Sequence, residues 1–544
     1  MGNHSKPTFS ARFDPVLLAL LAVAAFLLFF HLDHRPFWQD EAETACLARN
    51  VVHFGLPLAF DDVNLISQEE GREFGPDHLW RWSPWLQIYL TAAAFFLGGF
   101  STFAGRFPFA LFGLLCVWLV YRLIKVNFGN RHWALMSAAL LTFSVPFLLF
   151  SRQCRYYSLG AFFTLTALYA FRSDWQTRVA PAGLLVLSLG SLFYTNYLLC
   201  ASFLAPALLA AALLYPRDLL TPRTVTLALG LIILIIPGAL LFKFHDQASL
   251  LRYPDLGTMI LQHLEKYWTD LLQFMVPLPI CLYLLWRWRR VWQGAGGVPA
   301  DPGERFVLFC ALIVIGNIFF LLPAPQAEHR YLIHLYPLVA IVLGWTACCL
   351  WRYHKFSGAL FGLMLLFTNW LQLVPLHWLG IRYFPIYNDV HMLTYPNLTI
   401  RNFLIELGSP YPDVNQNLIN FFNTHARPGE TILTTYGDLP LQFYTRHQIL
   451  GGLQGRIPAP GEAPDWVVRR WHTRWNRDYF LQQSEDYILN QLNLARDYEM
   501  LVLPGEDEMF GNRADPYYHR FLPPEPRVRL VVYRKNLRVA HEHP

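Results

Sequence analysis

The chain has 544 residues, of which 54% are hydrophobic, 16% aromatic and only 15% charged, and its formal net charge is +5. This composition is too apolar for an ordinary soluble protein. The basic residues lie between apolar runs rather than on one face, so the charge does not indicate nucleic acid as a partner.

Apolar runs with the length of a transmembrane helix recur through the first two thirds of the chain. The first run lacks a cleavage site of small residues, so we expect an anchor rather than a removed signal peptide. The runs lie at 14–31, 85–100, 105–124, 133–150, 156–171, 180–194, 197–215, 225–243, 269–286, 306–322, 331–351 and 356–375.

Basic linkers orient these runs through the positive-inside rule. The linkers are YRLIKVNFGNRH, FRSDWQTR, YPRDLLTPR, WRWRRVWQ and WRYHK. If all twelve runs crossed the bilayer, some of these linkers would face outside. If 85–100 lies along the membrane surface instead, about eleven runs span and every basic linker shares the side of the N-terminus. A different number of spans within 180–215 would also place every basic linker on one side of the membrane.

The sequence therefore predicts a polytopic α-helical membrane domain over 1–375, with a first extracytoplasmic loop at 32–104. Two shorter outside loops are expected at 151–155 and 323–330. After residue 376, Pro, Asn, Asp and Arg become frequent and no run is long enough to span. Residues 376–544 are predicted to form a soluble extracytoplasmic domain of ordinary size.

This C-terminal region alternates helical and strand patterns, which is typical of an α/β or α+β sandwich. None of the eight cysteines lies beyond residue 349, so we expect no disulfide there. Helices are predicted at 413–425, 439–446 and 487–496, and strands at 430–436, 465–471, 498–504 and 527–535. Gly451, Gly452 and Gly455 are interpreted as turn glycines.

Polar groups concentrate in the outside loops. Asp40 and Glu41 follow directly on the first span, Arg152 and Arg155 occupy the second loop, and Arg330 lies in the last. An arginine fork matches phosphate oxygens, and a partly desolvated carboxylate at a membrane edge can accept a proton. The alternatives are that boundary arginines extend to lipid head groups and that the acids only cap a helix.

The order of motifs resembles a known family. RPFWQDEAETACLARNVVHFG is followed by RWSPWLQIYLTAAAFFLGGFSTFAGRFPF, and later by SRQCRYYSLG and EHRYLIHLYPLVAIVLG. This order is similar to bacterial relatives of the dolichyl-phosphate-mannose protein mannosyltransferases and of the aminoarabinose transferases that modify lipid A. These are membrane glycosyltransferases of the GT-C fold. The matching motifs are Asp40-Glu41, Ser83-Pro84, Gly99 to Ser101, and Arg106-Phe107-Pro108.

Two departures from the family pattern stand out. Many relatives carry an acid in the second outside loop, where it supports metal or phosphate binding, but this chain has none at 152–155. A divalent metal therefore stays possible but unassigned. Many relatives also read His-Pro-Pro where this chain has Trp82-Ser83-Pro84, so no contact is carried over from that stretch.

The resemblance implies transfer of a sugar from a polyprenyl-phosphate donor to a hydroxyl of a protein, lipid or glycan acceptor, at the outer face of a bacterial inner membrane. For such a donor we expect a single, inverting displacement with Asp40 as the base and Glu41 orienting the sugar or the acceptor. The donor phosphate would be held by Arg155 and Arg330, and more weakly by Arg152, His329, Tyr156 and Tyr331. The two tyrosines can equally be interface anchors.

Two other classes remain open from the sequence. A transporter or flippase would show charged or broken helices at mid-membrane, whereas here the charges gather in the loops. A catalytically silent relative that acts as an assembly subunit is the third possibility.

Overall fold

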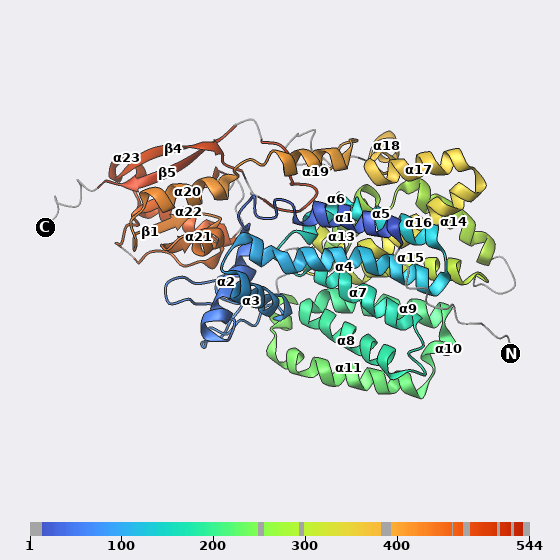
Figure 1. Ribbon diagram of the computed structural model, residues 1–544. Coiled ribbons are helices and arrows are strands. Elements are labelled where there is room, and N and C mark those ends of the chain that lie inside the picture. Colours follow the sequence, from blue (N-terminus) through green and yellow to red (C-terminus); the bar gives the residue numbers. More distant parts are fainter. Residues whose placement is uncertain are drawn as a thin grey trace.

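A computed structural model describes residues 14–248, 255–292, 299–381, 393–459, 461–471, 479–508, 512–523 and 527–536. The molecule is an elongated helical bundle with a mixed α/β domain at one end (Figure 1). That end is called the domain side below. The fold is therefore the predicted polytopic helical membrane domain followed by a C-terminal α/β domain.

The helical part begins with α1 (Pro15–Phe29), α2 (Gln39–Phe54), α3 (Leu86–Gly98), α4 (Thr102–Phe128), α5 (Arg131–Thr142), α6 (Val145–Ser151) and α7 (Tyr157–Arg172). It continues with α8 (Val179–Thr195), α9 (Tyr197–Leu214), α10 (Pro216–Leu219), α11 (Pro222–Leu241), α12 (Phe244–Ala248) and α13 (Leu256–Asp270). The last members are the π-helix η1 (Leu271–Met275), α14 (Leu278–Trp292), α15 (Pro302–Leu321), the 3₁₀-helix η2 (His329–Leu335), α16 (Tyr336–Tyr353), α17 (Lys355–Phe367) and α18 (Trp370–Trp378).

In the described part of the chain, 5 helices are long and apolar enough to cross a membrane, or up to 8 if each bent pair forms one span. Three shorter apolar helices, α1, α3 and α8, are additional. Three predicted continuous runs are bent. The 133–150 run bends by 63° between α5 and α6, the 269–286 run by 98° before α14, and the 356–375 run by 92° between α17 and α18. Pro146 and Pro277 lie at the first two bends, where proline removes a backbone donor.

Helix α3 does not traverse the bundle, in agreement with the predicted surface helix. The backbone N–H of Phe37, ahead of α2, donates to the Tyr444 hydroxyl at 3.0 Å, and Thr102 at the start of α4 bonds the same hydroxyl at 2.6 Å. The chain from α2 to α4 therefore leaves and returns on the domain side. Phe96 and Leu97 of α3 are highly exposed, as a lipid-facing helix requires.

The C-terminal domain contains α19 (Thr399–Gly408), α20 (Val414–His425), β1 (Thr431–Thr434), α21 (Asp438–Tyr444), β2 (Gln448–Gly451), η3 (Gly452–Gln454), β3 (Trp466–Val468), α22 (Tyr479–Gln491), α23 (Leu494–Asp497), β4 (Tyr498–Glu506) and β5 (Arg529–Lys535). The strand order is β2-β1-β3-β5-β4. The first three strands are parallel and β5 pairs antiparallel with both neighbours.

Alternate residues of each strand face opposite layers of this domain. Ile432 packs with Leu418 and Phe422 of α20, whereas Leu433 packs with Tyr487 and Ile488 of α22. Every predicted helix and strand of the domain is present, whereas helix α19, strand β2 and the short helix η3 are elements that the sequence pattern missed. Gly451, Gly452 and Gly455 all have positive φ, which supports the turn interpretation.

The outside loops gather beneath the C-terminal domain. Asn64 of the first loop exchanges hydrogen bonds with His447 and Ile449, at 3.0 and 2.8 Å. Gln153 donates to the Asn512 carbonyl at 3.4 Å, and Arg513 pairs with Glu328 at 3.1 Å. All three loops that the charge pattern placed together thus lie on the domain side.

Candidate active site

Helix α2 positions the acidic residues next to the bundle. It begins at Gln39 after Trp38, so Asp40 and Glu41 lie in its first turn, where the helix dipole favours carboxylates. Its end at Gly55 has a left-handed φ of 79°, which glycine adopts without strain. Asp40 and Glu43 are three residues apart and share one face, whereas Glu41 points to a different neighbour.

Asp40 lies between arginines from two distant loops. Arg330 donates a short hydrogen bond from Nη1 to Asp40 Oδ2, and Arg155 Nη2 is 3.9 Å from the same oxygen. Arg155 comes from the segment before α7, and Arg330 from η2. Loops that are far apart in the chain therefore meet at one carboxylate, as the sequence predicted.

Glu43 is a second carboxylate at this position that the sequence analysis did not single out. Its Oε1 accepts from Arg155 Nη1 at 2.6 Å, and its Oε2 accepts from Gln68 Nε2 at 2.6 Å. Arg155 Nη1 also donates to the Thr44 hydroxyl at 3.0 Å. Within the described residues, the buried Nε atoms of Arg155 and Arg330 have no hydrogen-bond partner. Each guanidinium thus keeps unused donor capacity.

A cavity of about 320 Å³ opens beside these ion pairs. Its walls come from α2, the first loop, the starts of α3 and α9, the segment before α7, α12, and η2 with the segment before it. The lining residues are Asp40, Glu43, Gln68, Glu69, Trp82, Ser83, Pro84, Gln87, Arg155, Tyr156, Asn196, Tyr197, Leu198, Phe244, Gln247, Ala324, Pro325, Gln326, Arg330 and Tyr331. We call it the polar cavity.

The charge balance of the polar cavity keeps Asp40 ionised. Burial alone would raise the pKa of the Asp40 carboxyl, but the charges of Arg330, Arg155 and Arg513 outweigh burial and hold the pKa below its usual value. Arg513 belongs to the C-terminal domain and lies 5.8 Å from the Trp38 ring. The domain therefore contributes charge to the site.

Tyr156 and Tyr331, the two boundary tyrosines, line the polar cavity next to the arginines. The guanidinium carbon of Arg155 is 5.9 Å from the Tyr156 ring centre, and that of Arg330 is 5.6 Å from the Tyr331 ring centre. The two rings therefore form walls of the site that hold the arginines.

Glu41 does not line the polar cavity, which differs from the role expected for it. It is fully buried and forms a two-pronged pair with Arg106, at 2.8 and 2.7 Å. It also accepts the backbone N–H of Cys154 at 2.7 Å. Arg106 further donates to the carbonyls of Leu32, Arg35 and Pro36. The Asp-Glu and Arg-x-Pro motifs thus meet in one buried ion pair that fixes the chain ahead of α2 and the second loop.

Arg152 is likewise outside the polar cavity, and it does not extend toward lipid. Its guanidinium donates to the carbonyls of Leu27, Leu28 and His31, at 2.9, 2.9 and 2.8 Å. These carbonyls belong to the end of α1 and the turn after it, where a cation complements the helix dipole. Arg152 therefore anchors α1 to the second loop.

His329 is fully buried behind Arg330 rather than facing the polar cavity. Its Nε2 lies 2.9 Å from the Tyr336 hydroxyl and its Nδ1 lies 3.4 Å from Asp270. Asp270 also binds Lys266 at 2.8 Å and accepts from Tyr517 of the C-terminal domain. This position suits a residue that orients the Arg330 backbone, since the two are adjacent in η2.

The described residues of the polar cavity are not arranged as a metal centre. The described residues contain no group of three or more His, Cys, Asp or Glu side chains placed to hold an ion. Asp40 and Glu43, two of the three carboxylates that line the cavity with Glu69, are already matched by guanidinium groups, which repel a cation. All eight cysteines are free thiols.

A second cavity, of about 300 Å³, is almost purely apolar and lies between α7, α8, α9, α11 and α15. Phe203, Leu204 and Ala207 of α9 contribute to its wall. The start of the same helix, Tyr197, lines the polar cavity. The two cavities thus share α9 at different heights.

Residues 83–241 match the family model described as Dolichyl-phosphate-mannose-protein mannosyltransferase. The crystal structure of ArnT from Cupriavidus metallidurans bound to undecaprenyl phosphate aligns over 94% of this chain and 99% of its own, with 14% identity and a TM-score of 0.54. The apo structure of that protein aligns over 92% and 98%, with 14% identity and a TM-score of 0.55. An oligosaccharyltransferase from Archaeoglobus fulgidus aligns over 90% of this chain and 69% of its own, with 14% identity and a TM-score of 0.43. No curated protein matches the sequence.

The fold and these alignments define the class: the chain is an integral membrane protein with the GT-C fold of membrane glycosyltransferases. Within that class, its residues 83–241 are similar to the dolichyl-phosphate-mannose-protein mannosyltransferases, the family whose motifs the sequence resembles.

Proposed function

We propose that this protein is a glycosyltransferase that moves a sugar from a polyprenyl-phosphate donor to an acceptor hydroxyl on the domain side. The observation that carries the proposal is the position of Asp40, held between Arg330 and Arg155 at the polar cavity. This arrangement puts a carboxylate and two phosphate-binding cations within reach of one substrate. The acceptor is a protein, a lipid or a glycan.

The arginines would bind the donor phosphate and stabilise it as a leaving group. A guanidinium offers a planar fork that matches phosphate oxygens, and both arginines have an unpartnered Nε. When the bond between the sugar and the phosphate breaks, negative charge grows on the phosphate oxygen. Two cations already placed at the cavity would stabilise this charge.

Asp40 would act as the general base. An entering phosphate competes with Asp40 for Arg330 and Arg155, so donor binding removes the interactions that hold the pKa of this carboxyl low. The carboxylate becomes a better proton acceptor only once the donor is bound. The acceptor hydroxyl then loses its proton to Asp40, and its oxygen attacks the anomeric carbon as the phosphate departs. A single displacement inverts the anomeric centre.

The remaining cavity residues would orient the substrates. Glu43 fixes the Arg155 guanidinium, and Tyr156 and Tyr331 border both arginines. Glu41 would act indirectly, through its pair with Arg106. Arg152 and His329 would hold α1 and η2 in place rather than touch phosphate.

The apolar cavity would hold the prenyl chain. From Tyr197 to Phe203 is six residues, or about 9 Å along a helix, so a lipid with its phosphate in the polar cavity could follow α9 into the apolar one. The alignment with an ArnT structure bound to undecaprenyl phosphate supports a lipid of this type. We place the protein in the bacterial inner membrane with the C-terminal domain outside, as the basic linkers indicate.

The test is transfer by the purified protein in proteoliposomes with a panel of polyprenyl-phosphate sugars and an extract of candidate acceptors. We expect Asp40→Asn to lower kcat by about 100-fold or more, the range for loss of a general base. Asp62→Asn is the matched control, because Asp62 is exposed in the same loop and has a positive φ that asparagine tolerates.

Unchanged transfer by Asp40→Asn would remove Asp40 as the base. Movement of the labelled lipid across the bilayer without any sugar transfer would instead favour the flippase alternative. Nuclear magnetic resonance of the product would report the anomeric configuration, and retention would overturn the single displacement.

A further inference from the structure

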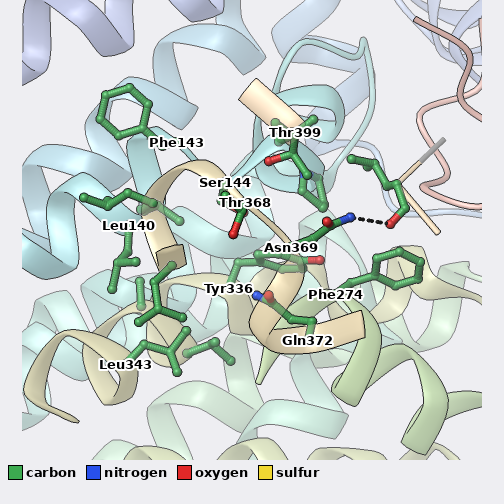
Figure 2. Close-up of a pocket in the computed structure, with 18 of the residues that line it drawn as sticks. Leu140, Phe143, Ser144, Phe274, Tyr336, Leu343, Thr368, Asn369, Gln372 and Thr399 are labelled. Atoms are coloured by element: carbon green, nitrogen blue, oxygen red, sulfur yellow. Dashed lines mark hydrogen bonds between the residues drawn. The ribbon is translucent and has the colours of Figure 1, made fainter. Parts of the chain in front are cut away.

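A second polar cavity lies inside the helical bundle, where all three bent helix pairs meet. Phe143 and Ser144 join α5 to α6, Gln273 and Phe274 belong to η1 before the sharp bend into α14, and Thr368 and Asn369 join α17 to α18. Tyr336 and Leu343 of α16 form the wall that these three breaks face (Figure 2). We call this the bend cavity. Broken helices and π-helical turns recur at functional sites.

Two amide side chains at the bend cavity have a carbonyl oxygen with no hydrogen-bond partner among the described residues. Gln273 is 2% exposed and Gln372 is 9% exposed, and the carbonyl oxygen of each is unpartnered within the described residues. Asn369 shows the contrast, because it donates to the carbonyls of Leu393 and Tyr395, at 3.0 and 2.8 Å. A buried polar group is normally hydrogen-bonded in a folded protein, so the two glutamine carbonyl oxygens can accept hydrogen bonds from a polar molecule in this space.

The chemistry of the walls restricts that molecule to an uncharged one. Among the residues that the structure describes, no Asp, Glu, Lys or Arg lines the bend cavity, so a phosphate or carboxylate there would meet no charged partner from them in an apolar interior. The polar groups are amides and hydroxyls, which suit hydroxyl groups as donors and acceptors. Figure 2 shows Asn369 and Gln372 on one side and the apolar Leu140 and Leu343 on the other. An amphipathic ligand fits this division.

The size of the bend cavity suits a small head group. Its volume is about 80 Å³, room for several molecules of water, each of which needs about 10–15 Å³. Leu365 and Leu366 of α17 continue the apolar wall, and their helix borders the outside of the bundle (Figure 1). A chain attached to the head group could leave along this side.

The bend cavity is separate from the polar cavity but is linked to it by two hydrogen-bonded residues. Tyr336 lines the bend cavity, and its hydroxyl lies 2.9 Å from His329 Nε2. His329 precedes Arg330, which binds Asp40. A ligand that contacts Tyr336 would therefore contact a residue that is hydrogen-bonded to η2, the 3₁₀-helix that contains Arg330.

We propose that the bend cavity is a second lipid site, which takes a lipid with an uncharged, hydroxyl-bearing head group such as a sugar or glycerol. Gln273 and Gln372 are the residues that recognise the head group, and the leucines of α5, α16 and α17 hold the start of its apolar chain. The site does not depend on the identity of the donor or of the acceptor.

The test is native mass spectrometry of the purified protein with glucosyl-diacylglycerol or phosphatidylglycerol. The detergent should have an oxyethylene head, because maltoside heads would compete for the site. We expect retention of glucosyl-diacylglycerol by the wild type and at least a tenfold loss in the Gln273→Leu, Gln372→Leu double variant. Gln176→Leu is the matched control, since Gln176 bonds Asp218 far from the bend cavity and should leave retention unchanged.

Binding of undecaprenyl phosphate, measured in the same spectra, reports whether the double variant is folded. If it is not, Ser144→Ala replaces it, because this change removes only one hydroxyl of the wall. Equal retention of glucosyl-diacylglycerol by wild type and variant would overturn the proposal. So would a wild type that retains neither lipid, because the bend cavity would then hold water only. A wild type that prefers phosphatidylglycerol would overturn it as well, because the head group would then carry a charge.

Discussion

The adjacent residues Asp40 and Glu41 lie in different environments, one at a cavity and one in a buried ion pair. Asp40 lines the polar cavity with Glu43, whereas Glu41, one residue along the same helical turn, is enclosed with Arg106. A motif of two acids therefore combines a residue that can meet a substrate with one that holds the loop. The difference follows from helical periodicity, which turns neighbouring side chains about 100° apart.

Removal of one partner of the Glu41–Arg106 pair should destabilise the fold. We expect Arg106→Leu to lower the free energy of unfolding by about 3–5 kcal/mol, because it leaves a buried carboxylate without its cation. Thermal unfolding in detergent measures this change. The double variant Glu41→Leu, Arg106→Leu should recover part of the loss, and an Arg106→Leu protein as stable as wild type would contradict the structural role.

Arg513 should lower the pKa of the Asp40 carboxyl without contacting the donor. Its charge is one of three that lower the pKa of the Asp40 carboxyl in the free enzyme. Arg513→Gln removes that charge, so the pKa rises and the carboxylate becomes protonated at higher pH. The acidic limb of the kcat/KM profile, which reports the free enzyme, should move to higher pH.

Arg456→Gln is the control for this measurement, because Arg456 is exposed and donates to the Val63 carbonyl at 3.3 Å. A loss of rate at every pH with an unmoved acidic limb would mean that Arg513 acts on substrate binding rather than on Asp40.

At the scale of elements, breaks and short helices arrange the site more than long spans do. The bends after α5, η1 and α17 were invisible to the hydrophobic pattern, since the apolar composition continues through each break. Helix α3 could be identified from the sequence as a surface helix. The positive-inside rule, applied to the basic linkers, requires one membrane crossing fewer than the number of apolar runs. Arg152 and Arg106 then attach the ends of α1 and α4 to the loops of the site.

The course of α3 can be tested by labelling. Phe100→Cys, just after α3, should react with a membrane-impermeant maleimide from the same side as Val63→Cys in the first loop. Val126→Cys, at the far end of α4, should react only from the opposite side. The wild type, whose native cysteines are buried or half-buried, gives the background. Opposite sides for positions 63 and 100 would mean that α3 crosses the membrane.

At the scale of the whole molecule, the C-terminal domain closes over the first loop through buried polar contacts. Asp438 at the start of α21 accepts from Gln39 Nε2 at 2.8 Å, and its Oδ2 has no partner among the residues that the structure describes. Burial raises the pKa of the Asp438 carboxyl to about 7, despite the bond from Gln39. Burial raises the pKa of Glu508 and of Glu73 to about 7 as well.

These raised pKa values predict that docking of the domain weakens as the solution becomes more basic. A carboxyl that is more easily protonated in the fold than in the unfolded chain contributes stability that is complete below the unfolded pKa of 3.8 and is lost as pH rises through about 7. The melting temperature should therefore fall between about pH 4 and pH 8. Asp438→Asn, which cannot ionise, should show a smaller fall, and an identical pH dependence in both proteins would exclude Asp438 as its source.

The sequence alone determined the features that depend on composition and order along the chain. Apolar runs gave the membrane domain, alternating patterns gave most of the C-terminal elements, and charge in the linkers indicated which loops share a side. Asp40, Arg155 and Arg330 could be chosen because acids and arginines on one side of a bilayer are costly unless they are used. These properties are local or statistical, so one sequence contains them.

Only the tertiary structure decided which polar residues meet. Glu43 pairs with Arg155, Glu41 with Arg106, and Arg152 with the end of α1, and no spacing in the chain distinguishes these outcomes. The two glutamines of the bend cavity and the charge of Arg513 beside Asp40 likewise come from segments far apart in sequence. Long-range packing chooses such partners, because an arginine can satisfy any carboxylate or carbonyl that the fold brings within reach.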